Sequence, residues 1–392
     1  MVLVHTATYK SKMRGIVYIL NFILSLQLAT IGYYTPNYFS HFGFSTEIIS
    51  LIFVFAAVGS ILGFYLSSFL FNKYGIRKSI LLAGTFYIFM IGILAYSSSF
   101  LAIFIFFLGA IFSAIIVSSL DVVMESANDT ENHTGAQRAT FLVMASFAYV
   151  AGPFLGGQLV KGADYQSLWF GASAIFLPFL FITFAKLPKI ENKKYTKLKI
   201  SHLLSVLKNA GDIRYIFFAQ FLLYFFYSVM VLYTSLYLKN VLHFSFEQMS
   251  IVFTIILIPF VVLTYPIGEL ADKYFGEKEF LIIGFLIMII ATVIFGAWNI
   301  TTPIEVIILL FFTRIGASIT STVTEIYFFK HIDGTNAEMI SAFRALYPIA
   351  NIIGPVFGMF IFMFGDYHTL FVSLGLMLSY GIYFSLKLKD TK

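Results

Sequence analysis

One arginine stands inside a long apolar segment, where a charged side chain is chemically unusual. Arg314 lies about ten residues into the stretch 303–327, roughly 15 Å along a helix that rises 1.5 Å per residue. A charge near the centre of a membrane is costly and is usually retained for function. None of the 19 acidic residues falls clearly at mid-depth. Arg314 is therefore a candidate to bind an anionic substrate, to reach a displaced carboxylate, or to donate to exposed carbonyl groups.

Three carboxylates lie near the ends of apolar stretches, close to basic residues. Asp121 and Glu125 are four residues apart, so a helix places them on one face. Glu325 lies at the matching end of the stretch 303–327. We expect ion pairs for Glu325 and for one of the other two, Asp121 or Glu125, although ordinary solvated loop charges are the alternative interpretation. The expected partners are Arg77 or Lys78 for the first two carboxylates, and Lys273 or Lys278 for the third.

Neutral polar side chains interrupt other apolar stretches. Amides and phenols are groups that pockets for sugars, nucleosides and drugs use for hydrogen bonding and stacking. A contact between two helices is the alternative interpretation for each residue. Besides Arg314, the candidates for substrate binding or coupling are Asn21, Gln27, Tyr34, Gln220, Tyr224, Tyr233, Tyr347 and Asn351.

The sequence lacks the residue patterns of common enzymes and pumps. It holds no cysteine, which excludes disulfides, thiolate metal sites and cysteine nucleophiles. No HExxH zinc motif, nucleophile elbow or phosphate-binding P-loop is present. We therefore expect neither an enzyme nor an ATP-driven pump, and no cofactor, metal ion or nucleic acid as a partner.

The elements that hold these side chains are apolar enough to cross a lipid bilayer. Of the 392 residues, 59% are hydrophobic and 11% are charged, whereas soluble domains have about 45–50% and about 25%. A membrane-spanning helix needs about 20 mainly apolar residues. The sequence therefore predicts an all-α membrane protein with twelve transmembrane helices, over 15–36, 46–71, 78–97, 99–121, 139–160, 166–186, 213–238, 247–270, 279–298, 303–327, 338–363 and 367–386.

The basic residues predict how the chain is oriented, because Lys and Arg concentrate in cytoplasmic loops. With the even-numbered loops inside, all but three of the 25 basic residues fall on one side or in the linker. We therefore expect an inner-membrane protein with both termini in the cytoplasm. The polar segment 187–212 is the expected linker between a six-helix bundle at 1–186 and a second one at 213–392.

The two halves of the chain match each other at a nearly constant offset. The order of the matches is preserved throughout, as duplication of a six-helix unit would produce. The clearest matches join 44–47 to 244–247, 72–74 to 272–274, and 152–156 to 354–358.

A loop in each half carries a family resemblance. The segment 268–278, GELADKYFGEK, resembles the signature loop of the major facilitator superfamily, Gly-x-Leu-Ala-Asp-basic-x-Gly, with one extra residue before the second glycine. The segment 68–78 keeps the basic residues, but Ser68 replaces the first glycine and Asn72 replaces the aspartate. The resemblance implies two pseudo-symmetric six-helix bundles, for which parallel repeats place the substrate near the membrane midplane.

The same loops predict a gate on the cytoplasmic side. A carboxylate at one helix end can meet a helix N-terminus or a basic residue, and a partly solvated pair breaks readily. A tight turn without a gating role is the alternative interpretation. The candidate gate residues are Asn72, Lys73, Arg77, Lys78, Asp121, Glu125, Gly268, Asp272, Lys273, Lys278 and Glu325.

A glycine–proline segment bears on the direction of transport. The segment 152–157, GPFLGG, resembles the motif of proton-coupled exporters in this superfamily, although Ala148 stands where the fuller motif has glycine. Small residues allow close helix packing, and proline permits bending. Packing alone is the alternative, because the second half echoes the segment. The candidate bending and packing residues are Gly152, Pro153, Gly156, Gly157, Gly354, Pro355 and Gly358.

These features predict a monomeric secondary active transporter that alternates access for a small solute, within membrane lipid and with protons as the coupling ion. Efflux of drugs or metabolites is the leading interpretation. Uptake of a sugar, nucleoside or organic anion, by a symporter or by a facilitator without coupling, is the alternative. A non-transporting receptor and a lipid flippase are alternatives of other classes.

Overall fold

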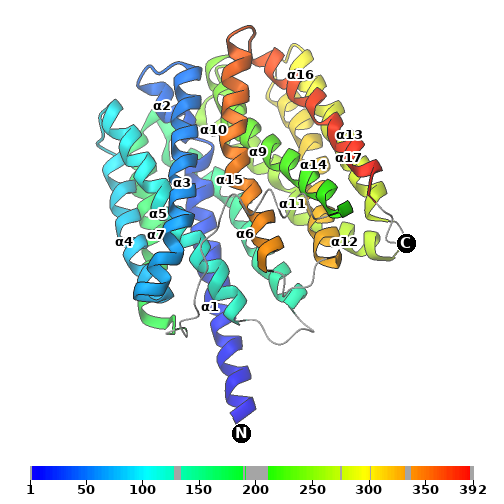
Figure 1. The fold of residues 1–392 in the computed structure, drawn as a ribbon. Coiled ribbons are helices and arrows are strands. Elements are labelled where there is room, and N and C mark those ends of the chain that lie inside the picture. Colours follow the sequence, from blue (N-terminus) through cyan, green and yellow to red (C-terminus); the bar gives the residue numbers. More distant parts are fainter. Residues whose placement is uncertain are drawn as a thin grey trace. The chain divides into compact units, whose positions relative to one another are not determined.

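The chain folds into long apolar helices, as the composition requires. Every regular element that the computed structural model describes is helical. Twelve helical segments in this part of the chain are long and apolar enough to cross a membrane, so the expectation of an all-α, multi-pass membrane protein is confirmed (Figure 1). The described residues are 2–127, 134–188, 190, 211–273, 276–300, 302–331 and 337–388. Most of the expected linker lies outside them.

The helices follow the predicted spans closely. In the first half they are α1 (Val2–Gly32), α2 (Thr35–His41), α3 (Thr46–Tyr74), α4 (Ile76–Leu94), α5 (Ser99–Ala127), α6 (Thr134–Leu159) and α7 (Tyr165–Lys186). In the second half they are α9 (Arg214–Asn240), α10 (Phe246–Leu257), α11 (Pro259–Val262), α12 (Thr264–Lys273), α13 (Glu277–Ala297), α14 (Pro303–His331), α15 (Ala337–Phe362), α16 (Tyr367–Met377) and α17 (Ser379–Leu386).

The first compact unit comprises Met1–Phe42 and Phe55–Lys197. Within it α1 packs along α6, and α4 packs against α5 and α7. A glycine permits one close approach: a Cβ atom on Gly63 of α3 would lie 2.3 Å from the carbonyl oxygen of Ile111 on α5. The small side chains thus set the spacing between helices in this unit.

The second compact unit comprises Gly43–Val54 and Leu198–Lys392, so it includes the first turns of α3. Two hydrogen bonds hold these turns in the unit. Ser50 Oγ lies 2.7 Å from the Tyr233 hydroxyl on α9, and Thr46 Oγ1 lies 3.1 Å from the Tyr367 hydroxyl on α16. Elsewhere in the unit α13 packs against α14 and α16, and α9 packs against α15.

Both halves begin their last span with the same aspartate cap. The backbone N–H of Ser167 donates to Asp164 at 3.0 Å, and that of Thr369 donates to Asp366 at 2.9 Å. These bonds satisfy an exposed donor at each helix start. Donation from the Ser167 hydroxyl lowers the pKa of Asp164, and donation from the Thr369 backbone lowers the pKa of Asp366. The internal repeat therefore extends to the starts of α7 and α16.

Candidate functional site

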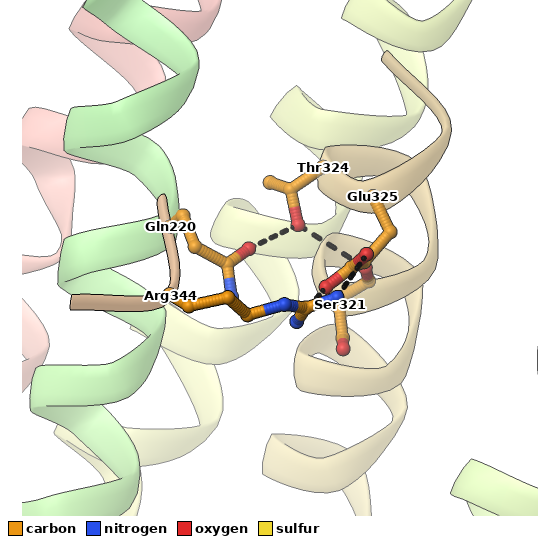
Figure 2. Close-up of polar contacts among 5 residues, drawn as sticks. All are labelled: Gln220, Ser321, Thr324, Glu325 and Arg344. Atoms are coloured by element: carbon orange, nitrogen blue, oxygen red, sulfur yellow. Dashed lines mark hydrogen bonds and ion pairs between the residues drawn. The ribbon is translucent and has the colours of Figure 1, made fainter. Parts of the chain in front are cut away.

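An ion pair joins α14 to α15 inside the second unit. Figure 2 shows Arg344 reaching from α15 toward Glu325 on α14. Its Nη1 lies 2.8 Å from one carboxylate oxygen and its Nη2 lies 3.3 Å from the other. The sequence did not predict this partner: Glu325 forms no described ion pair with Lys278, and the side chain of Lys273, the other expected partner, lies outside the described residues. The fork of the guanidinium matches both oxygens, which a lysine ammonium cannot do.

The ion pair is only partly shielded from solvent. The Glu325 side chain is 19% exposed and the Arg344 side chain is 29% exposed. Removing one partner of a fully buried pair would strand a charge at great cost, whereas a surface pair contributes little. This intermediate burial gives a pair that is stable yet breakable. The sequence named Glu325 but did not single out Arg344, which lay among the basic residues expected near the cytoplasmic side.

Neutral hydrogen bonds surround the pair and reach a third helix. The Thr324 hydroxyl donates to Gln220 Oε1 on α9 and lies 3.1 Å from the Ser321 carbonyl oxygen (Figure 2). Gln220 and Thr324 are both buried. A buried amide needs such a partner, since an unsatisfied polar atom costs about 1–3 kcal/mol. Helices α9 and α14 are thus joined directly beside the ion pair.

Two tyrosines complete this cluster. Tyr224 of α9 hydrogen-bonds with Gln220 and Arg344. Its ring meets that of Tyr347 on α15 edge to face, with centroids 5.3 Å apart. Tyr347 is half exposed. Of the residues predicted to bind substrate or to couple, Gln220, Tyr224 and Tyr347 therefore lie together around the ion pair of Glu325 and Arg344. We name these five residues the α9–α14–α15 cluster.

Arg314 occupies a different place on α14. Its side chain is almost fully buried, and its guanidinium carbon lies 5.3 Å from the ring centre of Phe226 on α9. Its Nε and Nη1 atoms are enclosed and have no hydrogen-bond partner. No acidic side chain in the described part of the chain forms an ion pair with it. The interpretation that Arg314 donates to exposed carbonyl groups does not hold in this structure.

In the first unit, two predicted amides contact neighbouring helices. The Tyr87 hydroxyl on α4 donates to Gln27 Oε1 at 3.0 Å, while the buried Gln27 Nε2 has no partner. Asn21 Nδ2 donates to the Phe141 carbonyl oxygen on α6 at 2.7 Å. Asn21 therefore joins two helices. Gln27 both joins helices and presents an unused donor.

The glycine–proline segment of α6 packs closely against α1. The Tyr34 hydroxyl donates to the carbonyl oxygen of Pro153 at 2.6 Å. A Cβ atom on Gly152 would lie 2.3 Å from the Ala29 Cβ, and one on Gly156 would lie 2.5 Å from the Tyr34 ring. Only glycine fits at these two positions without a shift. Tyr34 is thus part of a helix crossing. Gly157, which follows Gly156 in the motif, is also buried.

The second unit repeats this crossing between α9 and α15. The Tyr233 hydroxyl donates to the carbonyl oxygen of Pro355 at 3.0 Å. A Cβ atom on Gly354 would lie 2.5 Å from Ser228 Oγ, and one on Gly358 would lie 2.0 Å from the Tyr233 hydroxyl. The paired tyrosine was not recognised in the sequence, although Tyr34 and Tyr233 each precede their Gly-Pro segment at a similar distance. Asn351 lies half-buried one turn before Pro355 and makes no hydrogen bond with the described residues.

The predicted gate pairs of the first half are not formed. Arg77 Nη2 donates to the carbonyl oxygen of Phe184 at the end of α7, rather than to Asp121 or Glu125. Lys78 forms no ion pair with a described residue. The prediction that Arg77 or Lys78 pairs with these carboxylates is therefore wrong. A helix C-terminus carries partial negative charge, so Arg77 is favourably placed where it lies.

Elsewhere the predicted gate residues are partly exposed. Lys73 Nζ lies over the ring of Tyr74 at 5.1 Å, and Asn72 is exposed. In the second half Lys330 pairs with the buried Glu277 at 2.6 Å, a contact that the sequence did not predict. Gly268 has room for a Cβ, with Ile326 Cδ1 at 3.7 Å. Lys278 forms no ion pair with a described residue. The side chains of Asp272 and Lys273 are not among those that the structure describes.

The comparisons with known proteins follow the same architecture. The family model described as Major Facilitator Superfamily matches residues 17–234 and 216–391. No curated protein matches the sequence. The crystal structure of the nucleoside transporter NupG is similar over 96% of this chain and 100% of its own, with a TM-score of 0.76 and 13% identity.

Two further solved structures extend the comparison. That of the human organic anion transporter MFSD10 covers 96% of this chain and 99% of its own, with a TM-score of 0.69 and 16% identity. That of a POT family transporter in complex with 5-aminolevulinic acid covers 95% of this chain and 94% of its own, with a TM-score of 0.76 and 14% identity. At these identities the likeness is one of fold.

Proposed function

We propose that this chain, which belongs to the Major Facilitator Superfamily, is a proton-coupled secondary transporter that moves a small solute by alternating access. The family match covers both halves of the chain and supports transport as its general function. The observation that carries proton coupling is the partly shielded ion pair of Glu325 and Arg344, set among polar side chains in an otherwise apolar helix bundle.

The ion pair offers a chemical basis for coupling. When a proton binds the Glu325 carboxylate, the carboxyl becomes neutral and loses its attraction for Arg344. The guanidinium is then released to water or to another acceptor. Because the two residues lie on α14 and α15, protonation weakens the contact between these helices. Loss of the proton restores the ion pair. In each transport cycle Glu325 thus binds one proton and releases it again.

The energies are adequate for such a cycle. A potential of 100 mV acting on one charge supplies about 2.3 kcal/mol, and a difference of one pH unit supplies about 1.36 kcal/mol. A partly exposed ion pair contributes on the order of 1 kcal/mol. A physiological proton gradient therefore exceeds what is needed to break the pair.

We place the protein in the inner membrane with both termini in the cytoplasm, because nearly all basic residues fall on one side of the predicted spans or in the linker. We propose that it acts as a monomer. Efflux is the direction that we propose, from the resemblance of residues 152–157 to the exporter motif. Two of the similar structures are named as a nucleoside transporter and an organic anion transporter, and a POT family transporter is in complex with a thioalcohol-conjugated peptide. These solute classes and lipophilic cations are therefore the ones to test.

Reconstitution into proteoliposomes tests the proposal. The probes are uridine, dialanine, succinate and tetraphenylphosphonium, measured with and without a pH gradient of each sign. A proton-coupled transporter accumulates at least one probe against its concentration when the gradient is present. The sign of the gradient that drives accumulation distinguishes antiport, as efflux requires, from uptake by symport. Binding without movement would point to a receptor, and movement of labelled lipid alone would point to a flippase.

A glutamate variant separates coupling from binding. Glu325→Gln removes the titratable group and keeps its size. We expect it to lose accumulation driven by the pH gradient but to retain exchange of probe at equal concentrations on both sides. Glu279→Gln, on the exposed face of α13, is the control and should behave as the unaltered protein does. Gradient-driven accumulation by Glu325→Gln at the normal rate would refute the role of Glu325.

A further inference from the structure

We propose that Arg314 recognises the substrate, and that the substrate carries a carboxylate or phosphate group. This inference rests on the proposed transport function and adds the chemical class of the solute. Two enclosed nitrogen atoms of this guanidinium, Nε and Nη1, have no acceptor for their N–H groups. An anion with two or more oxygens is the partner that such donors lack.

The contrast with neighbouring basic residues makes Arg314 exceptional. In the described part of the second unit, Arg344 pairs with Glu325, Lys330 pairs with Glu277, and Lys239 donates to a backbone carbonyl oxygen. Each of these side chains is far more solvated than Arg314, yet each has an acceptor. Lys278 also has no ion-pair partner among the described residues, but it is partly exposed, whereas Arg314 is buried and has no acceptor.

The depth of Arg314 within its span adds to the free-energy cost of burying its charge. It lies eleven residues beyond Pro303, so roughly 16 Å along α14 at 1.5 Å per residue. A charge at such depth is retained mainly where it has a function. A structural role shared by the repeat is also excluded, since the first half has Gly109 near the corresponding position of α5. The asymmetry is what a single substrate-binding charge would leave.

Phe226 contacts the guanidinium of Arg314 without accepting a hydrogen bond from it. Its ring lies against Arg314 at 5.3 Å from the guanidinium carbon, a distance at which the ring face attracts the cation. A ring is not a hydrogen-bond acceptor of the ordinary kind, so this contact leaves Nε and Nη1 without one. The third nitrogen, Nη2, is not among the enclosed atoms and has no partner either. It therefore retains a small accessible surface from which an anion can approach.

The anion site is separate from the α9–α14–α15 cluster. Arg314 and Glu325 are eleven residues apart on α14, which corresponds to roughly 16 Å. At that distance the substrate does not compete directly with the proton for Glu325. A proton and an anion can therefore be bound at the same time or in turn.

A stability measurement without any ligand tests the first half of the argument. An unsatisfied buried cation destabilises the protein, so replacing it with an apolar side chain of similar length relieves a cost. We expect Arg314→Met to raise the melting temperature by about 2–4 °C. The matched control is Arg344→Met, in the same unit, which removes a paired arginine and should lower the melting temperature. A fall for Arg314→Met comparable to that for Arg344→Met would show a structural role and overturn the proposal.

A ligand measurement tests the second half. A compound that binds the folded protein raises its melting temperature with concentration. The anionic probes are benzoate, succinate, L-glutamate and glycerol 3-phosphate, and the non-anionic probes are uridine and tetraphenylphosphonium. We expect at least one anion to stabilise the unaltered protein, to have no effect on Arg314→Met, and to have a weaker effect on Arg314→Lys, which keeps the charge but loses the planar fork.

The remaining outcomes are equally informative. Stabilisation by no anion, or equal stabilisation of the unaltered protein and Arg314→Met, would overturn the proposal. Uridine or tetraphenylphosphonium acting on both proteins, together with their accumulation in proteoliposomes, would leave the transport function intact while refuting the anionic substrate. A carboxylate that acts where glycerol 3-phosphate does not would identify the group that Arg314 recognises.

Discussion

Substitution of Gly358 by alanine should destabilise the protein through a specific collision. The added Cβ would lie 2.0 Å from the Tyr233 hydroxyl and 2.1 Å from its Cζ atom, so the ring must move. Moving it breaks the bond to the Pro355 carbonyl oxygen and the contact with Ser50. Overpacking costs about 1–3 kcal/mol and a lost hydrogen bond about 0.5–1.5 kcal/mol, against about 1 kcal/mol gained in helix propensity. With both hydrogen bonds lost, the expected net loss is about 1–5 kcal/mol.

Thermal unfolding of purified protein measures this loss. Because the chain has no cysteine, thiol-reactive dyes cannot report unfolding, and intrinsic tryptophan and tyrosine fluorescence is the suitable signal. Gly109→Ala is the matched control, since its nearest neighbour is the Met90 Cβ at 4.0 Å. It should leave the melting temperature unchanged or raise it. Adding Tyr233→Leu to Gly358→Ala should cost less than the sum of the two single changes. A melting temperature of Gly358→Ala at or above that of the unaltered protein would refute the packing argument.

Two further changes test contacts in the two units. Tyr87→Phe removes the donor to Gln27 Oε1 and leaves a buried amide without a partner, so we expect the free energy of unfolding to fall by about 1–3 kcal/mol. The control Tyr380→Phe, at an exposed position, should leave the melting temperature unchanged. Equal melting temperatures for the two variants would contradict this prediction. Asp366→Ala removes the cap of α16 and should cost about 0.5–2 kcal/mol at neutral pH. The pKa of Asp366 is lowered in the folded state, so its contribution is complete above the ordinary value of 3.8 and is lost as pH falls through the lower, folded value. Melting curves of the variant and the unaltered protein should therefore converge in strong acid, and a constant gap across that range would argue against the cap.

The sequence predicted the spans and the family well, because both depend on local patterns. Runs of apolar residues define membrane helices by length alone. The loop at 268–278 and the repeated Gly-Pro segments identified the superfamily from a few residues, and the family match confirms it. The nearly constant offset between matching segments indicated duplication of a six-helix unit. Tyr34 and Tyr233, which meet the two Gly-Pro segments in the same way, show how far that symmetry extends.

The partners of the polar residues were harder to predict. A helix that is apolar all round has no marked face, so its sequence does not tell which neighbour a given side chain meets. Glu325 was expected to pair with a lysine near the signature loop, yet its observed partner is Arg344 on the next helix along the chain. Gln27 was recognised as polar and buried in a span, but nothing in the spacing pointed to Tyr87.

Burial without a partner was also invisible in the sequence. Arg314 stood out by its depth, but three interpretations remained open because each needed the positions of neighbouring helices. The structure narrows these interpretations by showing an enclosed guanidinium with two nitrogen atoms that have no acceptor, close to the ring of Phe226.

Proton movement driven by a solute gradient tests the central claim most directly. Proteoliposomes that enclose a pH-sensitive dye would receive succinate, benzoate, uridine or tetraphenylphosphonium on one side only, without an imposed pH gradient. The account predicts that at least one solute changes the internal pH, that Glu325→Gln abolishes this change, and that Glu279→Gln does not. Movement of a solute with no change in internal pH would contradict proton coupling, and an unaltered pH response in Glu325→Gln would show that the proton is carried elsewhere.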